Sequence, residues 1–415
     1  MTQPSGIGRR PGGFTLIELL VALVIGMVLT LAIFAVMTSF ESRRRTLVST
    51  ADLDQAGSVA MYQIDGWVRS AGNGFGQSAA YGFGCPLYAA KSDTQILPWT
   101  SSMTSSLSGT AFASINPGTS GVFRLAPVLI LPGQSAPGAS NAVTTGHTSD
   151  VLVLMSAATP LGGVPTLFNA GAGAATLTLE NTVAFTANDQ VLLVDQQPAS
   201  DGSIAPCMLT QSAITGSSGS ALTLSGTWYA STVDTVSVAG YSSTATALVM
   251  GNADLGRPPS FQLVGVGDRN TLYTYDLLRM SDTPLQAQAE GVFELHALYG
   301  VDTDGDGIVD TWVSPSDTSS AYTLAALSAG TATSAGLLKN IKAIRLGLIM
   351  RTSLPEKDVV KSDGYSTSGT SPTRTLTLFS DLGSNLAVTR TLTGAELYYR
   401  YRTVESTIPV RNNFL

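Results

Sequence analysis

Residues 12–40 read GGFTLIELLVALVIGMVLTLAIFAVMTSF, and from Phe14 onward this segment is almost wholly apolar. An apolar run of about 20 residues is long enough to cross the hydrocarbon of a bilayer as a helix. A cleaved secretory signal has a shorter apolar region that ends in small residues, whereas this run continues into a polar segment without a turn signal. We therefore predict that residues 14–40 form a membrane-spanning helix that is retained.

The segment before the apolar run, residues 1–13, is polar and glycine-rich and contains two arginines, so we interpret it as a short cytoplasmic leader that is removed. Glu18 interrupts the apolar run, where an ionised carboxylate costs about 2–3 kcal/mol or more. Such a charge needs a partner. The alternative is that the Glu18 side chain extends to the membrane surface, as it could in an ordinary membrane anchor.

The motif GGFTLIE at residues 12–18 resembles the class III signal of type IV prepilins. The resemblance implies that prepilin peptidase cleaves between Gly13 and Phe14 on the cytoplasmic side and that the new Phe14 amine is N-methylated. Cleavage creates a cation at Phe14, and Glu18 can compensate such a charge on a neighbouring subunit as helices pack side by side. We take this pairing as the hypothesis for assembly.

The helix is predicted to continue beyond the membrane as an amphipathic half, residues 41–70. Small and apolar residues recur there at spacings of three and four, as on one face of a helix: Leu53, Ala56, Ala60, Ile64 and Trp67. Gly72 and Gly74 then stop the helix. A helix over 14–70 is about 85 Å long at 1.5 Å per residue, with one half in the membrane and one half against a globular head.

The head, residues 71–415, is predicted to be rich in β structure. Charge almost disappears over 71–250, where apolar runs such as 150–154 and 190–195 alternate with Gly, Ser, Thr and Asn turns. A flexible linker is the alternative, although recurring Val and Leu runs favour strands. Residues 251–415 are expected to form a core sheet that includes a strand at 344–351. The alternation at 396–402 predicts a further, C-terminal strand.

The end of the chain, IPVRN at 408–412, resembles the tail of PilW-type minor pilins, as do IDGWVRSAG at 64–72, the strand start at 149–150 and IRLGL at 344–348. The resemblance covers both ends well and residues 86–250 poorly. It implies an α+β, type IV pilin-like fold, in which the long N-terminal helix packs on an antiparallel β-rich head.

Composition narrows the functional classes. The chain has 415 residues, a net charge of -7 and only 12% charged residues, a balance that suits an extracytoplasmic protein and disfavours contact with nucleic acid. Outside the cytoplasm, the two cysteines, Cys85 and Cys207, favour a disulfide that contributes about 4–5 kcal/mol in the chain-entropy model. Two separately buried thiols are the alternative.

An acidic loop at 302–310, DTDGDGIVD, has the spacing of an EF-hand-like calcium loop, with Gly307 at position 6. The predicted ligands are the carboxylates at positions 1, 3, 5 and 9 and the carbonyl at position 7: Asp302, Asp304, Asp306, Asp310 and Ile308. Position 12 is Val313 rather than glutamate, so we expect a structural Ca²⁺ site of modest affinity. A solvated acidic turn is the alternative reading.

Catalysis is not expected, because the chain has only two histidines, His147 and His296, and lacks a convincing nucleophile motif. His296 lies in an apolar strand-like segment and is expected to be a satisfied packing residue.

The favoured function is a structural, assembly-priming minor pilin. Family resemblance implies roles in twitching motility, adhesion or DNA uptake, and it implies other minor and major pilins, prepilin peptidase and a large tip adhesin as partners. The expected location is the inner membrane, with the head in the periplasm, and then the filament near its tip. The alternatives are a minor pseudopilin of a type II secretion system and a membrane-anchored surface adhesin.

Overall fold

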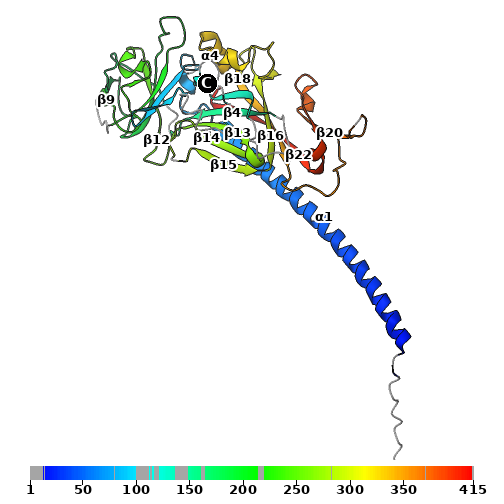
Figure 1. Ribbon diagram of the computed structural model, residues 1–415. Coiled ribbons are helices and arrows are strands. Elements are labelled where there is room, and N and C mark those ends of the chain that lie inside the picture. Colours follow the sequence, from blue (N-terminus) through cyan, green and yellow to red (C-terminus); the bar gives the residue numbers. More distant parts are fainter. Residues whose placement is uncertain are drawn as a thin grey trace, which may run out of the picture. The chain divides into compact units, whose positions relative to one another are not determined.

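The computed structural model describes residues 13 and 15–413, except 79, 100–111, 113, 114, 116–120, 136–147, 160–163, 214–218, 282 and 370. The chain divides into two compact units, Met1–Asp52 and Leu53–Leu415. One helix, α1 (Leu16–Ser70), begins in the first unit and ends in the second (Figure 1). Its last residue agrees with the predicted stop before Gly72, which has a left-handed φ of 80° that favours glycine.

The first unit contains the apolar part of α1. Residues Leu16–Thr38 are long and apolar enough to span a membrane, with a mean hydropathy of 3.0, and none of them is buried within the protein. Side chains such as Leu16 and Phe34 are 80% and 65% exposed. Because this much apolar surface is unfavourable in water, the segment requires lipid or other apolar helices around it.

In the second unit, the end of α1 buries the face that the sequence predicts. Leu53, Ala60 and Ile64 are buried in the main apolar cluster, and Ala56 and Trp67 pack against it. Gly57 lies so close to the sheet that an added Cβ would be 3.3 Å from side-chain atoms of both Met350 and Val404. The helix therefore packs directly on the strands that carry those two residues.

Two antiparallel sheets share this apolar cluster with α1. The four-stranded sheet has the order β17-β16-β18-β22, and its strands are β16 (Val292–Val301), β17 (Thr311–Val313), β18 (Ile341–Arg351) and β22 (Tyr401–Pro409). The five-stranded sheet has the order β15-β14-β13-β4-β3, and its strands are β3 (Val128–Ser135), β4 (Ser149–Ser156), β13 (Ser260–Gly267), β14 (Thr271–Asp276) and β15 (Leu285–Glu290). The predicted strands at 150–154 and 344–351 are thus confirmed within β4 and β18.

A six-stranded sheet is built from the Ser/Thr-rich region, so a folded β region, rather than a linker, is confirmed there. Its order is β2-β1-β8-β7-β12-β5, and its strands are β1 (Leu87–Lys91), β2 (Thr94–Leu97), β5 (Thr166–Leu167), β7 (Asp189–Val194), β8 (Cys207–Gln211) and β12 (Thr246–Asn252). The β1 and β8 pair is parallel, and the other pairs are antiparallel. One face of the sheet joins the main cluster, and the other packs in a second apolar cluster.

Short elements complete the second unit, in which β9 and β12 lie toward one end and β20 and β22 toward the other (Figure 1). The three-stranded sheet contains β19 (Tyr365–Ser366), β20 (Thr373–Leu378) and β21 (Val388–Thr393), and the two-stranded sheets pair β6 (Thr176–Thr178) with β9 (Ala221–Thr223) and β10 (Thr232–Val233) with β11 (Val236–Ser237). The short helices are α3 (Leu324–Leu327), α4 (Ala332–Lys339), η1 (Gly76–Ser78), η3 (Val238–Gly240), η4 (Asp268–Asn270), η5 (Ser380–Leu382), η6 (Gly394–Tyr398) and η7 (Arg411–Asn413).

The predicted strand at 396–402 is wrong in its first half, because residues 396–398 belong to the 3-10 helix η6 and β22 begins at Tyr401. The Glu396 carboxylate accepts a hydrogen bond of 3.1 Å from the Thr393 N–H and pairs with Arg390 at 2.7 Å. These contacts hold residue 396 in a helical turn, although the alternating pattern of the sequence favours an extended one.

Candidate functional site

The first turn of α1 is closed by Thr15 and Glu18. The Thr15 N–H and hydroxyl donate hydrogen bonds of 2.9 Å and 2.8 Å to Glu18 Oε2, and the Glu18 N–H donates one of 3.3 Å to Thr15 Oγ1. This reciprocal arrangement is a capping box, which satisfies main-chain donors that have no partner within the helix. Sequence reasoning missed the role of Thr15, although its signal, Thr-x-x-Glu at 15–18, was present.

Glu18 is the only ionisable residue in Leu16–Thr38, and it lies in the first turn of the helix. A negative charge is favoured at that end by the helix dipole. Gly13, on the near side of the predicted cleavage position, is exposed. Phe14 lies outside the described residues, so its pairing with Glu18 stays a prediction.

The acidic loop between β16 and β17 brings three of its carboxylates together. One ligand oxygen from each of Asp302, Asp304 and Asp310 lies within 4.8 Å of the other two. Asp302 is buried and accepts hydrogen bonds of 2.6 Å from the Gly305 N–H and 2.9 Å from the Gly307 N–H. These two N–H groups hold the side chain of Asp302 within the loop.

The other predicted ligands of the loop differ in their contacts. Asp306 is not in the group of three, and its carboxylate accepts a hydrogen bond of 2.7 Å from the Ile308 N–H. Two hydrogen bonds from Thr303 lower the pKa of Asp310, which favours its ionised form. Three oxygens of this kind suit a hard cation, so the cluster can hold a metal ion.

Comparison with known protein families fits these features at both ends of the chain. The family described as Type IV Pilus-assembly protein W matches residues 264–412, and the prokaryotic N-terminal methylation motif matches residues 8–34. These two matches support a PilW-type pilin. Neither a curated protein nor a solved structure is significantly similar to it.

The two matches divide the pilin into shared and individual parts. The methylation motif contains Gly13, Thr15 and Glu18, and the PilW match contains the four-stranded sheet, the acidic loop and the first two residues of the C-terminal turn η7. The six-stranded sheet, from β1 to β12, lies outside both matches. Features that distinguish this pilin from its relatives are therefore to be sought in that sheet.

Cys85 and Cys207 are joined by a disulfide, with their Cα atoms 5.7 Å apart. Cys85 lies two residues before β1, and Cys207 begins β8, the strand that pairs in parallel with β1. The bond closes a segment in which the cysteines are 122 residues apart in sequence. It thus fixes the start of the six-stranded sheet against the strand that returns beside it.

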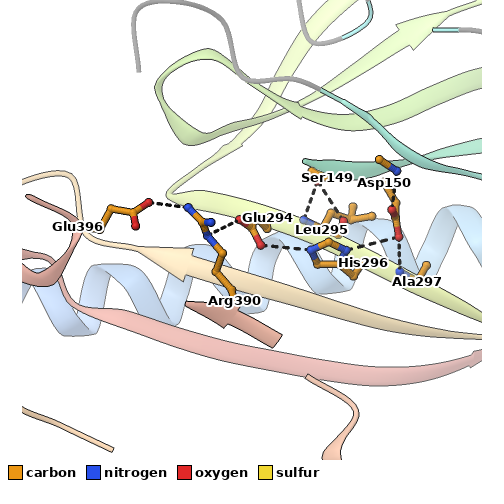
Figure 2. A network of polar contacts seen from close by, with 9 residues as sticks. Ser149, Asp150, Glu294, Leu295, His296, Ala297, Arg390 and Glu396 are labelled. Atoms are coloured by element: carbon orange, nitrogen blue, oxygen red, sulfur yellow. Dashed lines mark hydrogen bonds and ion pairs between the residues drawn. The ribbon is translucent and has the colours of Figure 1, made fainter. Parts of the chain in front are cut away.

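A chain of alternating charges crosses the head of the pilin through β16 (Figure 2). His296 lies between two carboxylates, with Nδ1 3.6 Å from Asp150 Oδ2 and Nε2 3.2 Å from Glu294 Oε2. Arg390 on β21 continues the chain, pairing with Glu294 at 3.1 Å and with Glu396 at 2.7 Å. The five side chains connect β4, β16, β21 and η6.

The predicted burial of His296 is nearly complete, with 13% of its side chain exposed, and the two carboxylates favour the charged form of its ring. Burial lowers its pKa, but the hydrogen bonds and negative charges of Asp150 and Glu294 outweigh this and raise the pKa to about 9. Ser149, next to Asp150, exchanges hydrogen bonds with the main chain of Leu295, at 3.0 Å and 2.8 Å. Its hydroxyl therefore connects β4 with β16. The other histidine, His147, lies outside the described residues.

The C-terminal turn η7 holds the end of α1. The Asn412 side-chain amide lies 3.0 Å from the Ala71 carbonyl oxygen and 3.3 Å from that of Ser70, and donates to both. The next residue, Asn413, donates to the carbonyls of Leu338 and Ile341, at 2.9 Å and 2.6 Å. The sequence of this tail indicates a family feature, but it does not predict a helix cap, because Asn412 and its partners Ser70 and Ala71 are far apart in sequence.

Proposed function

We propose that this pilin is a minor, assembly-priming subunit of a type IV pilus. The observation that carries the proposal is the start of α1, where Glu18 is the single charge of an apolar 23-residue segment that follows Gly13. Capping alone does not require the charge of Glu18, because a neutral glutamine can serve in the same cap and a carboxylate is unfavourable in lipid. Polymerisation gives the charge a role, because Glu18 can then pair with a cationic amine on a neighbouring subunit.

The contacts of Glu18 suggest how processing and assembly are connected. In the single chain, Thr15 satisfies the Glu18 carboxylate through a main-chain and a side-chain donor. Cleavage after Gly13 places the new amine of Phe14 next to Thr15 in the sequence. We infer that Glu18 is hydrogen-bonded to Thr15 in the membrane and forms an ion pair with the Phe14 amine of another subunit in the filament.

Two substitutions test the capping role of Glu18 and its charge separately, and a third is a control. Glu18→Gln keeps the capping acceptor but removes the charge, Thr15→Val removes the capping hydroxyl but keeps the charge, and Thr30→Val is a control on the same helix. We expect Glu18→Gln to remain in the membrane at normal levels and to be reduced at least about tenfold in sheared filaments. Thr30→Val should match the unmodified protein. Normal incorporation of Glu18→Gln would refute the pairing hypothesis.

The pilus and the type II secretion filament are distinguished by a deletion of the gene. We expect loss of surface pili, with secretion of folded exoproteins unchanged. Normal piliation together with lost secretion would assign the chain to the secretion filament instead. Intact mass of the membrane-extracted protein tests processing in the same cells, because the proposal requires Phe14 as its first residue, with a methylated amine.

The remaining parts of the proposal concern location, partners and calcium. The apolar helix anchors the chain in the inner membrane before assembly, with the head in the periplasm, and the filament position is near the tip. Prepilin peptidase, other minor and major pilins and a large tip adhesin are the proposed partners. Asp302, Asp304 and Asp310 are proposed to hold Ca²⁺ in a structural role, because clustered carboxylate oxygens match its preference for hard ligands.

A further inference from the structure

A cavity of ≈ 300 Å³ lies at one end of the six-stranded sheet. Its wall is formed by the ends of β7 and β12 and by the segments that follow β4 and β12. Polar and apolar residues both line it, but most of the lining surface is apolar, with contributions from Val164, Val249 and Leu255. Binding sites for small molecules have volumes of about this size or more, with mostly apolar walls and a few polar groups.

The apolar residues around the cavity are unusually exposed for a folded domain. Val164 and Leu255 line it and are 63% and 58% exposed, and Val183, next to the lining residue Ala184, is 81% exposed. Large apolar side chains grouped on one surface mark a place where a partner binds, and the volume of this hollow fits a small molecule. The family matches do not include this region, so the shared pilin architecture does not account for it.

The charges of the cavity differ in how they are satisfied. Asp189 is buried and accepts hydrogen bonds from the Thr186 N–H and hydroxyl and from the Asn252 side chain, at 2.6–2.8 Å. Its charge is thus compensated within the protein. Arg257 is exposed in the lining and has no ion-pair partner among the residues that the structure describes. A guanidinium in this position can pair with a carboxylate.

We propose that this cavity binds an apolar monocarboxylate, with the hydrocarbon chain against Val164, Val249 and Leu255 and the carboxylate on Arg257. Hydrophobic burial supplies the attraction, and the guanidinium selects the anionic end group. The site is independent of the assembly function proposed above, because it lies in the second unit and involves neither Glu18 nor the acidic loop. The ligand is defined by this chemistry: a short-chain or medium-chain fatty acid.

The test uses the full-length protein in amphipol and ligand-observed NMR with octanoate. Octanol and octylammonium share its chain but replace the end group, and acetate keeps the carboxylate without the chain. We expect saturable binding of octanoate, at least about tenfold weaker binding of octanol and octylammonium, and no binding of acetate. Equal binding of octanol or octylammonium would overturn the proposal.

Two variants locate the site, and a third controls for charge. Arg257→Gln should weaken octanoate at least about tenfold without changing octanol, and Ala184→Phe, at an exposed lining position, should block both ligands. Arg411→Gln removes an exposed arginine of η7 and should bind octanoate normally. Thermal melts establish that all three are folded. Octanoate binding that is unchanged in Arg257→Gln, or retained in folded Ala184→Phe, would refute this site.

Discussion

Asn412 is hydrogen-bonded to Ala71 across 341 residues of sequence, through a 3.0 Å contact between its side-chain amide and the Ala71 carbonyl oxygen. Helix ends leave carbonyl groups without partners, and here a residue near the C-terminus donates hydrogen bonds to them. The adjoining Gly72 N–H donates a 2.8 Å hydrogen bond to the Met155 carbonyl. The end of α1 is therefore fixed by both the five-stranded sheet and the C-terminal turn.

Replacement of Asn412 by alanine should lower the free energy of unfolding by about 1–2 kcal/mol, because the carbonyl groups of Ser70 and Ala71 lose their donor. Urea unfolding of the full-length protein measures the change. The matched control is Asn385→Ala, which alters an exposed asparagine and should stay within about 0.5 kcal/mol of the unmodified protein. Equal stability of the two variants would contradict the capping role.

Stability should fall as the pH rises through about 9, the raised pKa of His296. The folded pKa lies above the ordinary value of 6.5, so this contribution is fully present below pH 6.5 and is lost as the pH rises through 9. The shift corresponds to about 3 kcal/mol. Melting temperatures from pH 6 to pH 10 measure it. A His296→Gln variant should show a flatter profile, and identical profiles would rule out His296 as the source.

Calcium should raise the melting temperature of the full-length protein, and a chelator should reverse the effect. At a free concentration ten times the Kd, the stabilisation is about 1.4 kcal/mol. Asp302→Asn and Asp310→Asn should abolish the increase, because each removes a charge from the cluster. The control is Asp317→Asn, which changes an exposed carboxylate that accepts a hydrogen bond from Ser319. Calcium should raise its melting temperature as in the unmodified protein. If calorimetry detects no heat of calcium binding and calcium does not change the melting temperature, the calcium proposal is wrong.

Loss of the disulfide should lower the free energy of unfolding by about 2–5 kcal/mol, because the unfolded chain is then less constrained. The Cys85→Ala, Cys207→Ala double variant tests this in urea unfolding. A reductant should destabilise the unmodified protein to a similar extent and leave the double variant unchanged. Insensitivity of the unmodified protein to reductant would show that the bond contributes little.

Local sequence patterns predict the helix and several strands of this protein correctly. The spacing of Leu53, Ala60 and Ile64 identifies the buried face of α1, and the apolar runs within β4, β7 and β18 identify core strands. These signals succeed because each depends on neighbours within one element. The 3-10 helix at 394–398 escapes them, since Arg390 and Thr393 determine its turn through contacts with Glu396.

The candidate site is predicted less completely, for the same physical reason. The spacing of the acidic loop identifies Asp302, Asp304 and Asp310, but it does not show that Asp306 is outside their group. The partners of His296 come from β4 and from the neighbouring residue Glu294, and no local pattern pairs His296 with Asp150. The order of strands in the six-stranded sheet depends likewise on contacts between distant segments.

The position of Asn412 also has a consequence for biosynthesis. A ribosome makes Ala71 long before Asn412, so the last turn of α1 must wait for nearly the whole head to be translated before it receives this donor. A truncated product without the tail keeps main-chain carbonyls unsatisfied where the helix joins the head. A frayed junction opens more often and is cleaved more readily, so we expect the truncated chain to be degraded faster than the complete one.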